Sequence, residues 1–477
     1  MIKRLLLALV LLASTLHAEI ILPKVIGSGM VLQRESQAAI WGSADPGEAI
    51  TISCSWLNKP INVKAGADGN WLAKLKTGQA GGPHTIKLTS SNSIELEDVL
   101  FGEVWLDSGQ SNMEMPIAPV SSAYTGIKDW ESELATADYP QIRLFQVGNI
   151  ASKEPQKDVQ PGVLIYGVKV PPCKWQNCTP ETVKHFSSTA YFFARKLHKD
   201  LGVPIGIIDA SWGGTAIEPW IGKKHLSQAG FDEIARKGED KPDQPNARGI
   251  SSRLYNGMIA PLMPFTLKGA IWYQGESNQA RPQTYKRLMQ AMIADWRDGF
   301  KSDLSFYYVQ IAPFTYKQNA AYLREQQLQA LSIRKSGMVV TTDIGDLKDI
   351  HPKNKQEVGR RLALQALAND YGMKVACDGP RLKVMEIKDS KAILHFDHVG
   401  GGLTVYGGDE LKDFEIAGAD KKFVKASATI VGDKLVVGAP EVKQPVAVRY
   451  AFSSQATGSL MNKDGLPASP FRTDDWK

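Results

Sequence analysis

The chain has 477 residues, of which 43% are apolar and 22% are charged, and its formal net charge is +6. This composition excludes a disordered or fibrous protein, and about three domains are expected at roughly 100–200 residues each. A net charge of this size over so long a chain is too dilute to form a nucleic-acid-binding surface. We therefore predict no nucleic-acid partner.

Residues 1–18 have the three regions of a secretory signal peptide. Lys3 and Arg4 precede an apolar run over 5–13, and small residues lead up to Ala18. The run is too short to span a bilayer, so no membrane span is predicted. We therefore expect export to the periplasm or the extracellular space, and loss of this segment lowers the formal charge by two.

The four cysteines are compatible with an exported enzyme. Cys173 and Cys178 flank a short loop that a disulfide could close, and two unrelated thiols are the alternative.

Residues 19–98 are predicted to form an N-terminal β-domain. Short β-branched or alternating runs, such as 38–42, 49–53 and 84–88, are separated by clusters of Gly, Asp, Pro and Asn. This pattern favours a small sandwich.

From residue 99 to 375, apolar strands alternate with amphipathic segments of helical length, which indicates an α/β domain with a parallel sheet covered on both faces. The segments 114–180 and 221–250 are too long for plain connections, so we expect them to lie over the mouth of a site. From 376 to 477 short alternating strands return, which predicts a C-terminal β-domain. The expected strands are 102–107, 204–210, 267–273, 305–312 and 337–343, and the expected helices are 181–201, 282–298, 318–334 and 353–371.

Ser111 is the candidate nucleophile. It follows Gly109 and Gln110 directly after an apolar run, which is how α/β hydrolytic enzymes place a reactive hydroxyl on a sharp turn at the end of a strand. Gly and Ser are equally common in ordinary surface turns, so this motif needs support from a base and from oxyanion donors.

His351 is the candidate base. It follows the strand over 338–343 and opens the last helix of the α/β region, with Pro352 behind it. His395 and His398 superficially suggest a metal cluster around Asp397. Alternation along a strand puts neighbours on opposite faces, so no metal site is predicted.

Two further strand ends carry polar groups. One strand leads to Gln274, Glu276 and Asn278, which supply amides and a carboxylate. Another leads to Gly213 and Gly214, whose backbone N–H groups can point into a cavity. Phosphate binding is the alternative for this glycine pair, but the chain lacks the Lys and the longer Gly-rich loop of a nucleotide site.

Four motifs, Gly-Gln-Ser-Asn-Met, Ser-Trp-Gly-Gly-Thr, Trp-Tyr-Gln-Gly-Glu-Ser-Asn and Asp-Ile-His-Pro-Lys-Asn-Lys, occur in this order over 102–361. They resemble the sialate O-acetylesterase branch of the SGNH hydrolases, which has relatives among the acetylxylan esterases. The closing stretch 460–472 also resembles the end of these chains. The resemblance implies an α/β fold, in which an SGNH-like three-layer domain with a parallel central sheet is flanked by β-sandwich-like domains.

The resemblance makes Ser111 the nucleophile and His351 the base. The orienting acid is open, because Lys348 stands where many SGNH enzymes have Asp. Asp349, two residues before His351, and Glu276 are both candidates, and we favour Glu276 because a carboxylate two positions away often cannot fold onto the imidazole. The oxyanion hole would use the N–H of Ser111, the backbone of Gly213 and Gly214, and the amide of Gln274 or Asn278.

The implied reaction is a two-step acyl transfer from an O-acetylated carbohydrate, and it requires no metal or organic cofactor. Sialic acid is favoured over xylan as the substrate. An acetylxylan esterase and a non-catalytic glycan-binding protein are the alternatives, although a pure binder has no need for a Ser, a His and an acid at separate strand ends. A sialate carboxylate would require a cation, for which the candidates are Arg248, Arg253, Arg324 and Lys348. Aromatic residues that could stack on a sugar ring are Trp212, Trp220, Trp272 and Tyr273.

Overall fold

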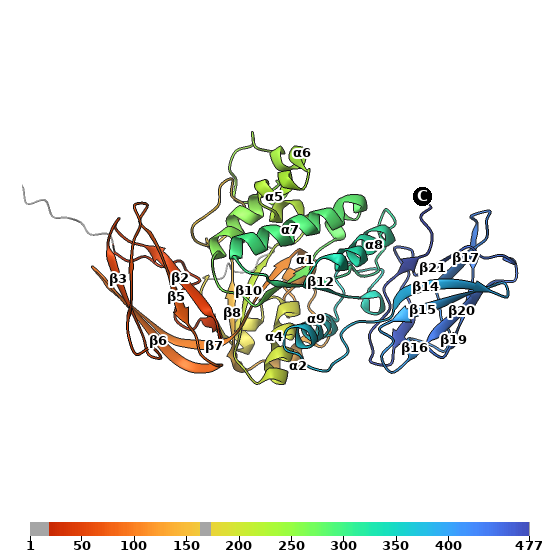
Figure 1. The fold of residues 1–477 in the computed structure, drawn as a ribbon, viewed down its shortest axis with the longest axis horizontal. Helices are drawn as coiled ribbons and strands as arrows, with labels where there is room; N and C mark the ends of the chain where they lie inside the picture. Colours follow the sequence, from red (N-terminus) through yellow and green to blue (C-terminus); the bar gives the residue numbers. More distant parts are fainter. Residues whose placement is uncertain (1–18, 163–172, 477) are drawn as a thin grey trace, which may run out of the picture.

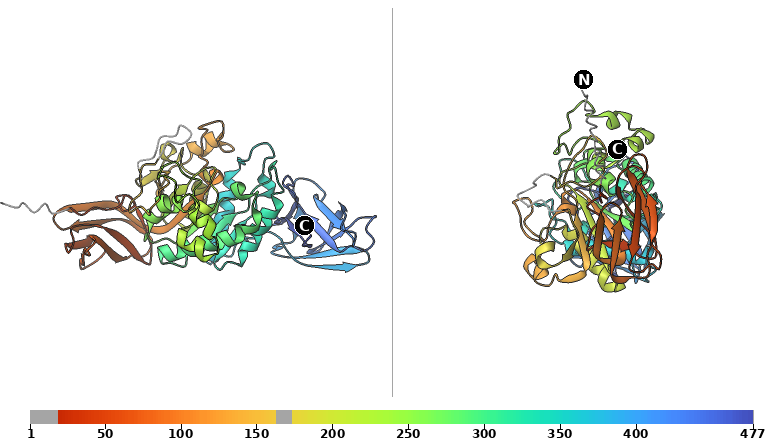
Figure 2. Two further views of the ribbon diagram at one scale, coloured as in Figure 1. Left: turned by 90° about the horizontal axis from the view of Figure 1, so that it is seen from above. Right: turned by 90° about the vertical axis from the view of Figure 1, so that its left-hand side faces the viewer.

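The computed structural model describes residues 19–162 and 173–476 (Figure 1). The molecule is elongated, with a mixed α/β body in the middle and β-sheets at both ends (Figures 1 and 2). The predicted signal peptide, residues 1–18, lies outside the described residues. Within the described ranges, no helix is long and apolar enough to cross a membrane.

The N-terminal strands alternate buried and exposed side chains, as the sequence pattern predicts. In β5, Trp71, Ala73 and Leu75 point inward and the residues between them are exposed. The strands here are β1 (Val31–Gln33), β2 (Gln37–Ser43), β3 (Ala49–Cys54), β4 (Ile61–Lys64), β5 (Asn70–Lys76) and β6 (Gly81–Thr89).

The long strand β7 (Ser93–Gly109) connects the N-terminal sheet to the central one. Its first part pairs with β6, and its second part pairs with β10 and β11 of the central sheet. Exposed positions occur only up to residue 98, and residues 99–109 are all buried. The predicted boundary at 98/99 therefore falls inside one strand, at the point where its surroundings change from solvent to core.

The central sheet has the order β13-β12-β11-β7-β10-β8-β9, and all of these pairs are parallel except β8 with β9. The strands β8 and β9 lie in the segment 114–180, for which no strand was expected from the sequence. The bounds are β8 (Tyr139–Gln146), β9 (Gln176–Cys178), β10 (Ile205–Ser211), β11 (Gly269–Tyr273), β12 (Ser305–Val309) and β13 (Ser336–Val339).

Helices cover both faces of this sheet. Trp105 packs into a core that contains residues of α4 and α9, whereas Val104 and Leu106 enter a core that contains residues of α7. Figure 1 shows α7 on one side and α4 with α9 on the other. The longer helices are α4 (Ser188–Leu201), α7 (Tyr285–Phe300), α8 (Ala321–Gln329) and α9 (Lys355–Asn369), and the shorter ones are α1 (Ser111–Glu114), α2 (Trp130–Ala135), α3 (Pro180–Val183), α5 (Lys223–Gln228) and α6 (Asp232–Arg236).

The helix expected over 181–201 is two helices, α3 and α4. The break has a capping residue, Ser187, whose Oγ accepts the N–H of Ala190 at 3.1 Å and donates to the carbonyl of Met113 at 2.7 Å. A serine in this role begins a new helix, so the apolar periodicity alone overestimated the length.

Cys173 and Cys178 are separate free thiols in the structure. The Sγ of Cys173 lies 3.3 Å from the carbonyl oxygen of Gln160, and that of Cys178 lies 3.9 Å from the carbonyl oxygen of Ala137. The structure therefore has the alternative of two unrelated thiols.

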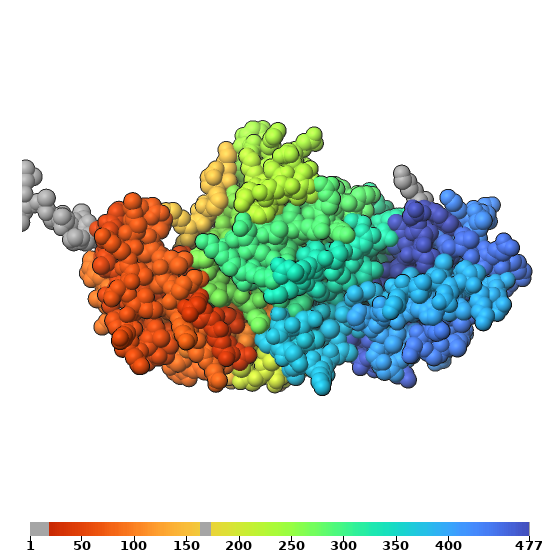
Figure 3. Space-filling view, in the orientation of Figure 1, coloured from red at the N-terminus to blue at the C-terminus, as the bar shows by residue number. Residues whose placement is uncertain are grey.

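The C-terminal region is built of β-sheets around its own apolar core. Arg324 joins it to the α/β body, because its buried guanidinium donates to the carbonyls of Ile311, Ala312, Ser453 and Ser454. The two regions lie in contact in Figure 3. The strands are β14 (Arg381–Lys388), β15 (Lys391–Asp397), β16 (Leu403–Val405), β17 (Phe414–Ala417), β18 (Phe423–Lys425), β19 (Ser427–Val431), β20 (Lys434–Gly438), β21 (Ala447–Tyr450), β22 (Leu460–Asn462) and β23 (Phe471–Arg472).

Two carboxyl groups are buried side by side beneath the carboxyl edge of the central sheet. Asp107 of β7 and Asp209 of β10 are neighbours in register and are 0% and 2% exposed. Asp209 accepts the hydroxyl of Ser211 at 2.6 Å. Burial raises the pKa of Asp107 well above its ordinary value, with a further rise from Asp209, and burial raises the pKa of Asp209 to about 7.

When the pKa of a carboxyl is higher in the folded state than in the unfolded state, its contribution to stability is fully present below the unfolded-state pKa, near pH 4. This contribution is lost as the pH rises to the folded-state pKa. Replacing Asp107→Asn removes one of the two ionisations. We expect the melting temperature of the variant to exceed that of the wild type by a gap that widens from pH 5 to pH 8. Asp232→Asn, at an exposed position, is the control; a gap that stays constant with pH contradicts the prediction.

Candidate active site

Three of the four sequence motifs meet at the carboxyl edge of the central sheet. The N–H of Trp212 donates to the carbonyl of Gly109, and the N–H of Gln110 donates to the carbonyl of Tyr273, both at 3.0 Å. Gly109 has a φ of +142°, and a Cβ there would lie 2.2 Å from the Tyr273 oxygen. Only glycine fits this turn, which brings the ends of β7, β10 and β11 together.

Ser111 is the first residue of α1, and 9% of it is exposed. The residue before it, Gln110, is fixed by its side-chain oxygen, which accepts from Nε2 of Gln274 and from the N–H of Ser277, both at 3.1 Å. The Nε2 of Gln110 donates to no other residue that the structure describes. An amide donor beside the candidate nucleophile is therefore available.

His351 lies in the loop before α9 and has 13% of its side chain exposed. Its ring meets that of Tyr124 edge to face, with the centroids 5.3 Å apart. Burial, assisted by the positive charge of Lys355, lowers the pKa of His351 to about 4. Among the described residues no hydrogen bond joins His351 to Ser111, so their pairing stays a prediction.

The two candidate acids have different surroundings. Asp349 accepts the backbone N–H of His351 at 2.9 Å, and the same Oδ1 lies 3.6 Å from Nδ1 of the imidazole. This local turn brings a carboxylate two positions away close to the ring, which is the geometry that we did not expect. Glu276 is buried and accepts from Nδ2 of Asn112 at 2.6 Å, and its Oε2 has no hydrogen-bond partner among the described residues.

Glu114, directly after the motif that contains Ser111, was not singled out from the sequence. Its carboxylate accepts from the hydroxyl of Tyr124 at 2.6 Å, from the N–H of Gly213 at 2.8 Å and from the amide of Asn149 at 2.9 Å. It thereby ties the turn after β10 to the segment that contacts His351. The signal in the sequence was its place one helical turn after Ser111.

The expected oxyanion donors are partly engaged within the protein. The N–H of Gly213 donates to Glu114, and Nε2 of Gln274 donates to Gln110, to the carbonyl of Thr215 and to Asn278. The Nδ2 of Asn278 donates to Glu218 at 3.1 Å, and the side chains of Gln274 and Asn278 are buried. The N–H groups of Ser111 and Gly214 donate to no other described residue.

The four candidate cations have different roles. Arg324 and Arg253 are buried and donate to backbone carbonyls, so they are structural. Lys348 is exposed. Arg248 is half-buried, its guanidinium carbon lies 5.9 Å from the centre of the Trp212 ring, and one of its nitrogens is 3.6 Å from the position of a Cβ on Gly214. It is the candidate that lies beside the turn after β10, and it forms no ion pair with another described residue.

The four candidate stacking aromatics are core residues, because each is at most 2% exposed. Trp220, Trp272 and Trp296 form an edge-to-face row with centroids 6.0 Å apart. The candidates are Trp212, Trp220, Trp272 and Tyr273.

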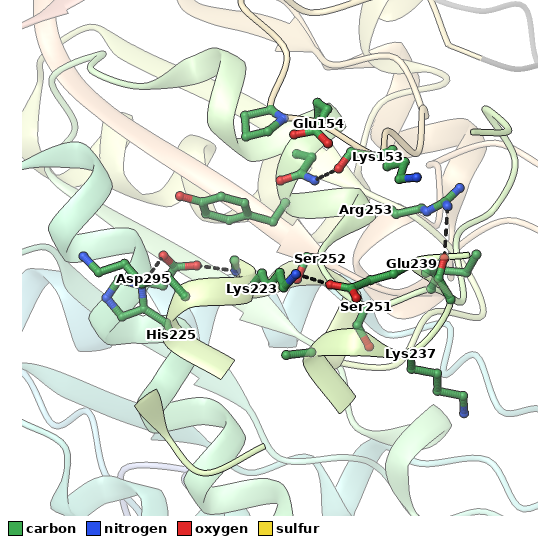
Figure 4. Close-up of a pocket in the computed structure, with 18 of the residues that line it drawn as sticks. Lys153, Glu154, Lys223, His225, Lys237, Glu239, Ser251, Ser252, Arg253 and Asp295 are labelled. Atoms are coloured by element: carbon green, nitrogen blue, oxygen red, sulfur yellow. Dashed lines mark hydrogen bonds and ion pairs between the residues drawn. The ribbon is translucent and has the colours of Figure 1, made fainter. Parts of the chain in front are cut away.

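The segment 221–250 forms α5 and α6, which project beside α7 (Figure 1). Beneath them is a cavity of about 550 Å³ (Figure 4). Some of its polar groups pair with one another; for example, Nδ1 of His225 lies 2.7 Å from Oδ1 of Asp295. None of Ser111, Glu276 and His351 lines it. Near the end of the segment, Arg248 lies beside Gly214, and the placement of the segment over the mouth of the site stays a prediction. Among the described residues no group of His, Cys, Asp or Glu is placed to hold a metal ion.

A hydroxyl on a tight turn, an imidazole kept neutral by burial and free N–H donors suit nucleophilic attack on an ester carbonyl. The family model described as a carbohydrate esterase, sialic acid-specific acetylesterase, matches residues 101–368. The sialate O-acetylesterase of Homo sapiens is 31% identical over 496 residues, which cover 94% of this chain and 91% of that protein, and that of Mus musculus is 31% identical over 523 residues, which cover 94% and 93%. The crystal structure of a carbohydrate acetylesterase from Xanthomonas citri, 38% identical, has a TM-score of 0.85 and covers 96% of this chain and 100% of that chain.

The variants Asp349→Asn and Glu276→Gln distinguish the two acids. Because Asp349 lies closer to the imidazole, we expect its replacement to lower the kcat for a chromogenic acetyl ester by on the order of 10³-fold. Glu276→Gln should lower kcat by a smaller factor, since Glu276 is connected to this loop through Asn112. Asp346→Asn, in the same loop and exposed, is the control. The reverse ranking would assign the role to Glu276, and two near-wild-type variants would leave a Ser–His dyad.

Proposed function

The chain belongs to the sialic acid-specific acetylesterase family of carbohydrate esterases and is a carboxylic ester hydrolase, and from this premise we propose that it removes O-acetyl groups from sialic acid. The observation that carries the choice of sugar is Arg248, a cation beside the turn after β10 that has no ion-pair partner among the described residues. A sialic acid has a carboxylate to bind there, and the neutral xylose units of acetylated xylan have none.

In the proposed mechanism, Oγ of Ser111 attacks the acetyl carbonyl while His351 takes the hydroxyl proton. The tetrahedral intermediate collapses to an acetyl-serine, and His351 returns the proton to the sugar oxygen that leaves. Water, activated by His351, then attacks the acetyl-serine and releases acetate. Asp349 orients the imidazole and stabilises its charged form.

For the oxyanion we propose the N–H groups of Ser111 and Gly214 together with Nε2 of Gln110. The proposal is supported by the absence of a hydrogen-bond acceptor for these donors among the described residues. The amides of Gln274 and Asn278 are given a supporting role, because they hold Gln110 and the turn after β10. Losing a single donor typically costs about 3 kcal/mol of barrier.

The finer architecture is also a proposal: an SGNH-like three-layer domain over residues 99–375, with β-sandwich-like domains over 19–98 and 376–477. The two separate four-stranded sheets of the C-terminal region support the sandwich. We further propose export to the periplasm or the extracellular space. Its support is the composition of residues 1–18.

Ser111→Ala and His351→Ala should each lower the turnover of acetyl esters by several orders of magnitude, because members of such a unit act together. Circular dichroism checks that the fold is intact. His185→Ala, which changes a histidine on the segment between α3 and α4, is the control and should retain activity. More than about a tenth of wild-type activity in either variant would refute the assignment.

Arg248→Gln should raise the KM for O-acetylated sialic acid by roughly 10–100-fold, the loss expected for a charge-assisted hydrogen bond. A small neutral acetyl ester has no charge to lose, so its KM should not change. Lys348→Gln, which removes an exposed charge from the His351 loop, is the matched control. Equal effects on both substrates, or faster wild-type release of acetate from acetylated xylan, would replace sialic acid with a neutral sugar and leave the esterase chemistry in place.

A further inference from the structure

A lysine is fully buried behind the candidate active site. Lys355, the first residue of α9, is 0% exposed, although lysine is almost never buried without a charged partner. Its position at a helix N-terminus is also unfavourable, because the positive end of the helix dipole lies there. Among the described residues no carboxylate lies within ion-pair distance of its ammonium group. So costly an arrangement calls for a functional reason.

The side chain is held by a single short contact. Its Nζ donates to Oδ1 of Asn112 at 2.6 Å and lies 5.4 Å from the centre of the Tyr273 ring. Asn112 in turn donates from Nδ2 to Glu276 at 2.6 Å and to the carbonyl of Ile350 at 3.0 Å. The amide of Asn112, the residue after the nucleophile, therefore links the buried ammonium to Ile350, the residue before the base.

We propose that Lys355 is a positioning residue that holds the His351 loop against the Ser111 turn through Asn112, and whose positive charge keeps the imidazole in its neutral, proton-accepting form. The inference rests on the proposed function, because it takes His351 as the base. Lys355 touches neither the substrate nor the reacting atoms in this scheme.

The electrostatic sign follows from the groups that face the two side chains. Burial is the main cause that lowers the pKa of His351 to about 4, Lys355 lowers it further, and Asp349 raises it. Burial lowers the pKa of Lys355 to about 7, against the raising effects of Glu276 and Asp349. Lys355 is therefore charged in the range from about pH 4 to 7, where an ordinary histidine would become protonated. The remaining titratable groups that act on Glu276, His351 or their surroundings include Tyr124, Tyr273, Tyr285, Tyr316 and Arg324.

The test is the acid limb of the kcat/KM profile for a neutral acetyl ester, which reports the base of the free enzyme. In the wild type this limb should lie near pH 4. In Lys355→Met the charge is gone, so the limb should move up by roughly one pH unit. Lys355→Gln removes the charge but keeps a hydrogen-bond donor for Asn112. It should therefore show the same shift of the limb as Lys355→Met, with a smaller loss of kcat at pH 8 than that variant.

Lys353→Met is the matched control. Lys353 is a lysine two residues after His351, and it is exposed, so its removal should leave the limb in place because solvent screens its charge. The wild type supplies a measurement that does not depend on any variant. Salt screens a buried charge only weakly, so the acid limb should stay at the same pH between about 0.05 and 0.5 M NaCl.

An unshifted limb in a folded Lys355→Met or Lys355→Gln enzyme overturns the proposal, as does an equal shift in Lys353→Met. If neither Lys355 variant folds, the proposal is overturned when the acid limb of the wild type moves to higher pH with added salt. These outcomes are distinct from failure of the proposed function, which would appear as a wild-type enzyme without activity or a His351→Ala variant that keeps it.

Discussion

At the carboxyl end of β7 the backbone of Gly109 packs directly against the carbonyl of Tyr273 on β11, where a Cβ would lie 2.2 Å from that oxygen. The same turn accepts the N–H of Trp212 from the end of β10. Three strand ends are thereby held at hydrogen-bond distance, and Ser111 follows immediately. The placement of the nucleophile beside the glycine pair and the third motif depends on this close approach of main chains.

Polar and charged groups that are buried around the turn hold it in one arrangement. Glu114 gathers three donors, and Asn112 connects Glu276 to Lys355. Burying such groups is costly unless every one is hydrogen-bonded. A site that is assembled before the substrate arrives needs little reorganisation during the reaction, which is the basis of electrostatic stabilisation in enzymes.

The α/β body with β-sheets beyond it was predicted from local patterns, because strand and helix periodicity are short-range properties. Long-range or specific interactions were missed. Ser187 divides one expected helix by capping the second half. The sequence reasoning did not expect the turn at His351 that brings Asp349 to within 3.6 Å of the ring nitrogen, and the choice between Glu276 and Asp349 stays a prediction. The aromatics that were candidates for sugar stacking are packed in the core.

From the sequence alone came the candidate nucleophile, the candidate base and the order of the motifs, since these depend on which residue types follow each apolar strand. Only the tertiary structure decided which polar groups remain free. Gln110 and Gln274 are 164 residues apart, and Asn112 and Lys355 are 243 apart, yet each pair shares a hydrogen bond. Whether a donor is available to a substrate depends on such partners, and the partners are set by how the strands are ordered in the sheet.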